Sequence, residues 1–106
     1  MVGNYKVITL CGSTRFKDEF LLAQKELTLA GNIVISVGLF GHSGDTEAWN
    51  DSTNEMLVDM IKRKIDMADE IYVINVNGYI GESTKKEIAY AKETNKKVNY
   101  RYPNKE

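Results

Sequence analysis

The chain has 106 residues, of which 27% are charged and 42% apolar, and its formal net charge is −1 at pH 7. This size and balance fit one globular domain with one core, and they exclude a fibrous or disordered protein. A charge near zero leaves no global positive field for a nucleic-acid polymer, and no apolar run approaches the roughly 20 residues of a membrane span. One cysteine, Cys11, excludes an internal disulfide, and the N-terminus shows no secretion signal, so we expect a cytoplasmic protein that binds neither nucleic acid nor a membrane.

The first half of the chain predicts two buried strands and a helix between them. Residues 6–11 are mostly apolar and β-branched, as in a strand that is covered on both faces. Apolar residues then recur at spacings of three and four from Phe16 to Ala30, which is the stripe of an amphipathic helix, and Gly31 suits its end. A second buried strand is predicted at 33–37.

The second half begins with a long glycine-containing loop that holds the only histidine, His42. A helix is predicted from about 53 to 68, because Ser52 and Glu55 have the spacing of a capping box and apolar residues follow at helical period. The remaining predicted elements are a buried strand at 70–76, a helix at 84–94, an edge strand at 97–102 and a polar tail from about 103.

This alternation of strands and helices predicts a single α/β domain, residues 1–106. Right-handed crossovers make it a small doubly wound parallel sheet, flavodoxin-like or Rossmann-like, with three main helices on its two faces. We expect four strands in the order 2-1-3-4, so that the loops after the first three strands meet at one edge of the sheet. Those loops and the helix starts carry the candidate site residues: Ser13, Thr14, Arg15, His42, Asp45, residues 75–83 and Glu87.

The first of these turns, residues 12–15, has two open interpretations. Free backbone N–H groups at a helix start favour an anion, and the forked donor of Arg15 suits a phosphate or carboxylate. Alternatively, Ser13 or Thr14 only caps the helix and Arg15 is solvated. The turn is neither a Walker loop nor the Gly-x-Gly-x-x-Gly fingerprint, which disfavours an ATPase or an NAD-dependent enzyme.

Glu87 likewise allows two interpretations. With Thr84 it has capping-box spacing, which would turn its carboxylate back to the start of its own helix. If it points into the cleft instead, it could act as a nucleophile or a base. Glu82, in the preceding loop, is a competing acid.

No metal site or cofactor is predicted, because His42 has no second ligand-type residue at metal spacing and Cys11 is expected to be packed in a buried strand. The aromatic residues Phe40, Trp49 and Tyr79 lie in the cleft loops. They could stack on a base or a sugar, or they could only pack a lid over the site.

Three stretches carry a resemblance to a known family: residues 8–15 (ITLCGSTR), 68–74 (ADEIYVI) and 81–91 (GESTKKEIAYA). In order and spacing they resemble the nucleoside 2-deoxyribosyltransferase superfamily, which includes the 2′-deoxynucleoside 5′-phosphate N-hydrolases. The resemblance implies that Glu87 is the nucleophile that attacks the anomeric carbon of a deoxyribose. It also implies substrate contacts at these positions: Gly12, Ser13, Thr14, Arg15, Gly81 and Ser83.

The chain departs from the family pattern in one catalytic position and in length. The family places an acid that assists the leaving base eight residues before the position of Asp69, and Ile61 stands there. Asp59 and Asp66 are near but out of register, and a shift of the helix could bring Asp59 into the role. Because the chain is shorter than typical members, we expect a homodimer.

These observations lead to the expectation of an enzyme that breaks or exchanges the N-glycosidic bond of a nucleoside or nucleoside 5′-phosphate, without a cofactor. The missing in-register acid motivates an alternative, a non-catalytic nucleotide-binding module that uses the same cleft as a sensor or a sequestering protein. A third possibility is an interaction protein whose cleft is vestigial.

Overall fold

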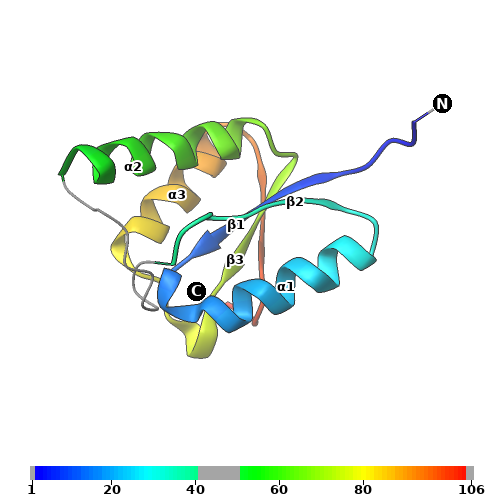
Figure 1. The fold of residues 1–106 in the computed structure, drawn as a ribbon, viewed down its shortest axis with the longest axis horizontal. Coiled ribbons are helices and arrows are strands. Elements are labelled where there is room, and N and C mark those ends of the chain that lie inside the picture. The colour runs from blue at the N-terminus through cyan, green and yellow to red at the C-terminus, as the bar shows by residue number, and fades with distance from the viewer. Residues whose placement is uncertain (1, 41–50, 105–106) are drawn as a thin grey trace.

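The computed structural model describes residues 2–40 and 51–104, and strands and helices alternate along them (Figure 1). Four strands form one parallel sheet in the order β2-β1-β3-β4. The predicted α/β class, the parallel sheet and the strand order 2-1-3-4 are therefore confirmed. The strands are β1 (Val7–Gly12), β2 (Ile33–Ile35), β3 (Glu70–Ile74) and β4 (Lys97–Tyr100).

Three main helices cover the two faces of this sheet, as predicted. The helix α1 (Lys17–Leu29) packs on one face, and α2 (Asp51–Asp66) and α3 (Glu82–Glu93) pack on the other (Figure 1). Two short 3-10 turns complete the described elements. The turn η1 (Thr14–Phe16) directly precedes α1, and η3 (Val76–Gly78) follows β3.

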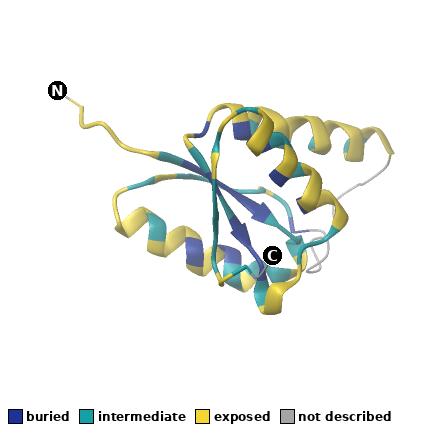
Figure 2. Cartoon of the chain, turned by 180° about the vertical axis from the view of Figure 1, so that it is seen from behind, coloured by how far each residue is buried: buried dark blue, intermediate teal, exposed yellow. Residues whose placement is uncertain are grey.

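Alternating side chains along the strands divide the core into two halves. Leu10 of β1 points toward α1 and packs with Phe20, whereas the next residue, Cys11, points toward the other two helices and packs with Ile65 and Ile88. Figure 2 shows the buried residues concentrated in β1, β3 and the inner sides of the helices. The alternation therefore puts the thiol of Cys11 beneath α2 and α3.

The second strand is shorter than the predicted range 33–37, and a lysine side chain binds the two residues that follow it. β2 stops at Ile35, and the ammonium group of Lys64 donates hydrogen bonds to the carbonyl oxygens of Ser36 at 2.9 Å and Val37 at 3.4 Å. These carbonyls are satisfied by α2 instead of by a sheet partner. The turn after β2 is thereby tied to α2.

Asn75 ends the third strand and clamps the C-terminal segment to the sheet. Its buried side-chain amide donates to the carbonyl oxygen of Tyr102 at 2.9 Å and accepts from the Tyr102 backbone N–H at 2.9 Å. Beside this clamp, Arg101 pairs with Glu19 at 2.6 Å and Glu26 at 2.9 Å on α1. These bonds explain why β3 and β4 end earlier than the predicted 76 and 102.

Helix α3 begins earlier than predicted, which changes the interpretation of Glu87. Gly81 is the N-cap and makes no side-chain capping bond, so that Thr84 lies inside the first turn, where it is buried. The predicted capping box between Thr84 and Glu87 is therefore wrong. Ser52, also predicted to cap a helix, lies within α2.

Three residues that the sequence analysis named in the second loop, His42, Asp45 and Trp49, lie outside the described residues.

Candidate functional site

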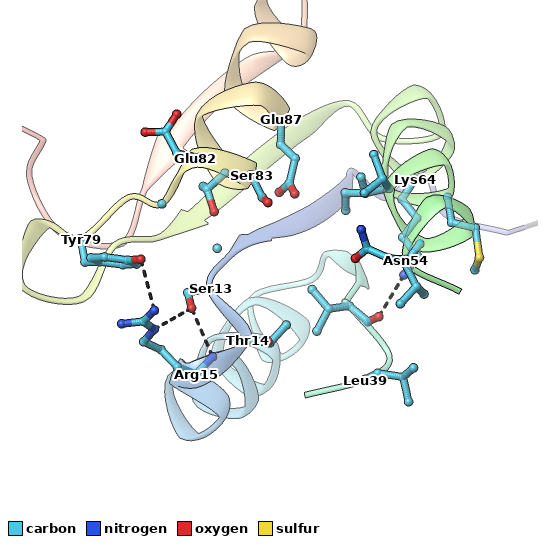
Figure 3. A pocket seen from close by; sticks show the side chains of 18 residues that line it. Ser13, Thr14, Arg15, Leu39, Asn54, Lys64, Tyr79, Glu82, Ser83 and Glu87 are labelled. Carbon is cyan, nitrogen blue, oxygen red and sulfur yellow. Dashed lines mark hydrogen bonds between the residues drawn. The ribbon is translucent and has the colours of Figure 1, made fainter. Parts of the chain in front are cut away.

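A cavity of about 580 Å³ opens at the carboxyl ends of β1 and β3, between α2, α3 and η1 (Figure 3). This is the edge at which a parallel sheet with the order 2-1-3-4 is expected to bind ligands. Most of the sequence-predicted site residues line it: Gly12, Ser13, Thr14, Arg15, Gly81, Ser83 and Glu87.

Asp59 is not brought to this cavity. It is exposed on α2 and is absent from the lining, whereas its helix neighbours Val58 and Met60 belong to it. Phe40 is also elsewhere, because its ring packs edge-on against Phe20 in the core at 5.5 Å between ring centres. Three aromatic residues were predicted to wall the cleft. Trp49 lies outside the described residues, and Tyr79 lines the cavity.

Glu87 reaches from α3 into the cavity (Figure 3). The thiol of Cys11 on β1 and the positive charge of Lys64 on α2 both favour the charged form of its carboxylate. Burial disfavours the charged form more strongly than these two contacts favour it, so the pKa of Glu87 rises to about 7. Near neutral pH this carboxyl is therefore divided between its charged and its neutral forms.

Two further groups act on Glu87: Lys64, which lines the same cavity, and Cys11, which is buried beneath α2 and α3. Cys11 is 0% exposed, and burial raises the pKa of its thiol well above the ordinary value, so that the thiol keeps its proton and can donate it. Burial also lowers the pKa of Lys64, against the attraction of the nearby Glu87. Lys64 was not predicted as a site residue, although it falls at the helical period of α2.

Ser13, Arg15 and Tyr79 form a second polar group across the cavity from α2. The hydroxyl of Ser13 accepts from the backbone N–H of Arg15 at 3.3 Å and from its Nε at 3.0 Å. The guanidinium of Arg15 lies 4.5 Å from the centre of the Tyr79 ring and donates to the Tyr79 hydroxyl at 3.2 Å. Ser13 therefore caps η1, as one of the two interpretations of this turn predicted, and Ser13 and Tyr79 hold the exposed Arg15 at the cavity rim.

The wall that α2 contributes is mainly apolar, with one amide. Leu57, Val58 and Ile61 lie on it together with the polar side chain of Asn54. An apolar wall with a few placed polar groups is the usual lining of a small-molecule site. The helical period in the sequence predicted which side of α2 faces the sheet. It did not show that part of this side lines a cavity.

Among residues 2–40 and 51–104, no group of three or more His, Cys, Asp or Glu side chains could hold a metal ion. The helices in these ranges are also too short or too polar to cross a lipid bilayer.

Comparisons with protein-family models, with curated protein sequences and with solved structures found no match to this chain.

Proposed function

We propose that the protein acts on the N-glycosidic bond of a nucleoside or nucleoside 5′-phosphate, preferably a deoxynucleoside, by transfer or hydrolysis. The observation that carries this proposal is the shared cavity, into which Glu87 projects from α3 while Arg15 is held at the rim beside Ser13. A nucleophile and an anion-suited donor at opposite parts of one cavity match a substrate with an anomeric carbon at one end and a phosphate or hydroxyl at the other.

In this proposal the charged form of Glu87 attacks the anomeric carbon. A C–O bond to the carboxylate forms, the C–N bond breaks, and the base leaves with the bonding electron pair and takes up a proton from solvent water. Water or a second base then attacks the same carbon and gives up a proton to solvent, while the C–O bond to Glu87 breaks and releases its carboxylate. A pKa of about 7 leaves roughly half of the carboxyls ionised at neutral pH, enough for a working nucleophile.

The start of α3 supports binding of a 5′-phosphate. Gly81 makes no side-chain capping bond, so the first backbone N–H groups of this 12-residue helix are not used by a cap. Residues 81–84 line the cavity, and Ser83 adds a hydroxyl group to this lining (Figure 3). Together with the guanidinium of Arg15, these donors favour a negatively charged group.

A second candidate is a nucleotide-binding module without turnover. The observation that favours it is the wall from α2, whose described lining residues include no carboxylate that could assist a leaving base. Asp59, the acid predicted for that role, is exposed and lies off the lining. In this alternative, Glu87 and Lys64 only contribute to binding.

The experiment is incubation of the protein with deoxynucleosides and with their 5′-monophosphates, followed by chromatography of the free base. We expect release by the wild type and a loss of at least about 100-fold in Glu87→Gln. Glu93→Gln is the matched control, because Glu93 is on the same helix but is exposed and does not line the cavity. Undiminished release in Glu87→Gln would refute Glu87 as the nucleophile, and no release by the wild type would refute the enzyme. Tight calorimetric binding without release would select the binding module.

A further inference from the structure

Three side chains from three different elements come together at the cavity: Lys64 and Glu87 line it, and Cys11 is buried beneath the two helices that carry them. Cys11 comes from β1, Lys64 from α2 and Glu87 from α3, and they are separated by 53 and 23 positions along the chain. Bringing a thiol, an ammonium group and a carboxylate together out of water has an unfavourable desolvation free energy for each group. The structure compensates for this cost with fixed contacts at each of the three residues.

Lys64 is fixed at both its backbone and its side chain. Its carbonyl oxygen accepts a hydrogen bond of 2.8 Å from the hydroxyl of Thr9 on β1, which sets the position of α2 on the sheet. Its ammonium group donates to the carbonyl oxygens of Ser36 and Val37. Two of its three N–H groups are thus held by the turn after β2, and the positive charge stays at the cavity.

Cys11 is fixed by complete burial. It is packed beneath α2 and α3 against Ile88, the neighbour of Glu87 in the chain, and its protonated thiol favours the charged form of the Glu87 carboxylate. A carboxylate has two oxygens, so a donor on one side restricts how the group can rotate and leaves acceptor capacity toward the cavity. This is the geometry that a nucleophile needs if one oxygen is to meet a substrate.

We propose that Cys11 and Lys64 are positioning residues that favour the charged form of the Glu87 carboxyl and keep it aimed into the cavity. This inference rests on the proposed role of Glu87 as a nucleophile. Cys11 supplies a hydrogen bond to one oxygen, and Lys64 supplies an immobile positive charge from the facing helix. Neither residue touches the substrate in this role.

The electrostatics of the site agree with this assignment. Burial by itself raises the pKa of Glu87, and the Cys11 thiol and the Lys64 charge both lower it, to the final value of about 7. Among the other charged groups of the lining, Arg15 is bound to Tyr79 at the rim, and Glu82 is turned to solvent. Removal of either positioning residue should therefore leave Glu87 protonated at neutral pH.

The test is a titration of the Glu87 carboxyl carbon by NMR in protein labelled at the glutamate side chains, with the Glu87→Gln spectrum as the assignment. The variants are Lys64→Gln, which keeps a donor for the two carbonyls but removes the charge, and Cys11→Ala, which removes the thiol. Lys64→Arg and Cys11→Ser are the conservative partners, and they keep the charge and the donor respectively. Lys62→Met, which removes an exposed cation of α2 that lies over the Tyr90 ring and outside the cavity lining, is the control.

We expect the titration midpoint to rise by about one pH unit in Lys64→Gln and in Cys11→Ala. The two conservative variants and Lys62→Met should titrate like the wild type. A purely structural role would predict equal midpoints in all folded variants, so a midpoint in Lys64→Gln or Cys11→Ala that matches the wild type would overturn the proposal. If Cys11→Ala does not fold, the comparison of Lys64→Gln with Lys64→Arg decides the matter.

A second measurement separates this inference from the proposed function. Because the NMR titration needs no substrate, it remains decisive even if no base is released. If base release is observed, the acidic limb of its pH profile should move upward in Lys64→Gln by the same amount as the NMR midpoint. A profile that stays in place while activity falls would assign Lys64 to binding instead and would contradict the proposal.

Discussion

Replacement of Glu87 by glutamine should stabilise the protein at alkaline pH, although it should also abolish the proposed activity. Glutamine keeps the size of the side chain and an oxygen that can accept from the Cys11 thiol, but it cannot ionise. The wild-type carboxyl, in contrast, must be charged in a partly buried place once the pH exceeds its pKa. A nucleophile held in such a place is therefore a source of instability.

The magnitude follows from the pKa of the partly buried carboxyl. Burial raises it from the ordinary 4.5 to about 7, and at about 1.4 kcal/mol for each pH unit this rise corresponds to about 3 kcal/mol. Because the folded state holds this proton more tightly than the unfolded state, wild-type stability falls as the pH rises from about 4.5 to about 7. The advantage of Glu87→Gln should therefore be near zero at pH 4, grow across this window and level off above it at about 3 kcal/mol.

The assay is urea denaturation of the wild type and Glu87→Gln at pH 4, 5.5, 7 and 8.5, with the difference in unfolding free energy as the result. This difference cancels the other titrating groups, which are shared by the two proteins. Glu82→Gln, at an exposed glutamate of the same helix, should show a difference near zero at every pH. A difference for Glu87→Gln that does not change with pH, or a less stable variant at pH 8.5, would refute the reasoning.

Two further predictions concern the framework of the site. Asn75→Ala should lower the unfolding free energy by about 2 kcal/mol, because it leaves the backbone N–H and the carbonyl oxygen of Tyr102 without their two partners; a loss as small as that of Asn54→Ala, at an exposed asparagine, would contradict the clamp. Gly12→Ala should cost at least about 2 kcal/mol, since φ is +148° and the added Cβ would lie 2.9 Å from the carbonyl oxygen of Ile74. Gly38→Ala, with φ of +82° and open space around the Cβ, should cost less in the same denaturation assay, and equal losses would rule out the close approach as the cause.

The position of Glu87 at the site edge was predictable from local pattern, but its direction was not. The strand at 70–76, the glycine turn and the helix after it place this residue at the carboxyl edge of the sheet. Local capping rules then favoured Thr84 as a helix start, because hydroxyl side chains are good N-caps. The burial of Thr84 in the first turn of α3 overrides this preference, and with the earlier start Glu87 is free to face the cavity.

The same limit applies to the residues of α2. Helical period in the sequence indicates which side of α2 faces the sheet, but Asp59 and Lys64 are both polar residues close to that side. The burial of Ile65 and the hydrogen bond between Thr9 and the Lys64 carbonyl settle the rotation of the helix. That rotation brings Lys64 to the cavity and leaves Asp59 in solvent.

By itself, then, the sequence determined the elements, the parallel sheet, its strand order and the edge at which a site would form. These features depend on hydrophobic periodicity and on the handedness of crossover connections, which are local or nearly universal. Only the tertiary structure decided that Cys11, Lys64 and Glu87 meet. Their meeting depends on how three elements far apart in the chain pack against one another, and residue spacing carries no record of such a contact.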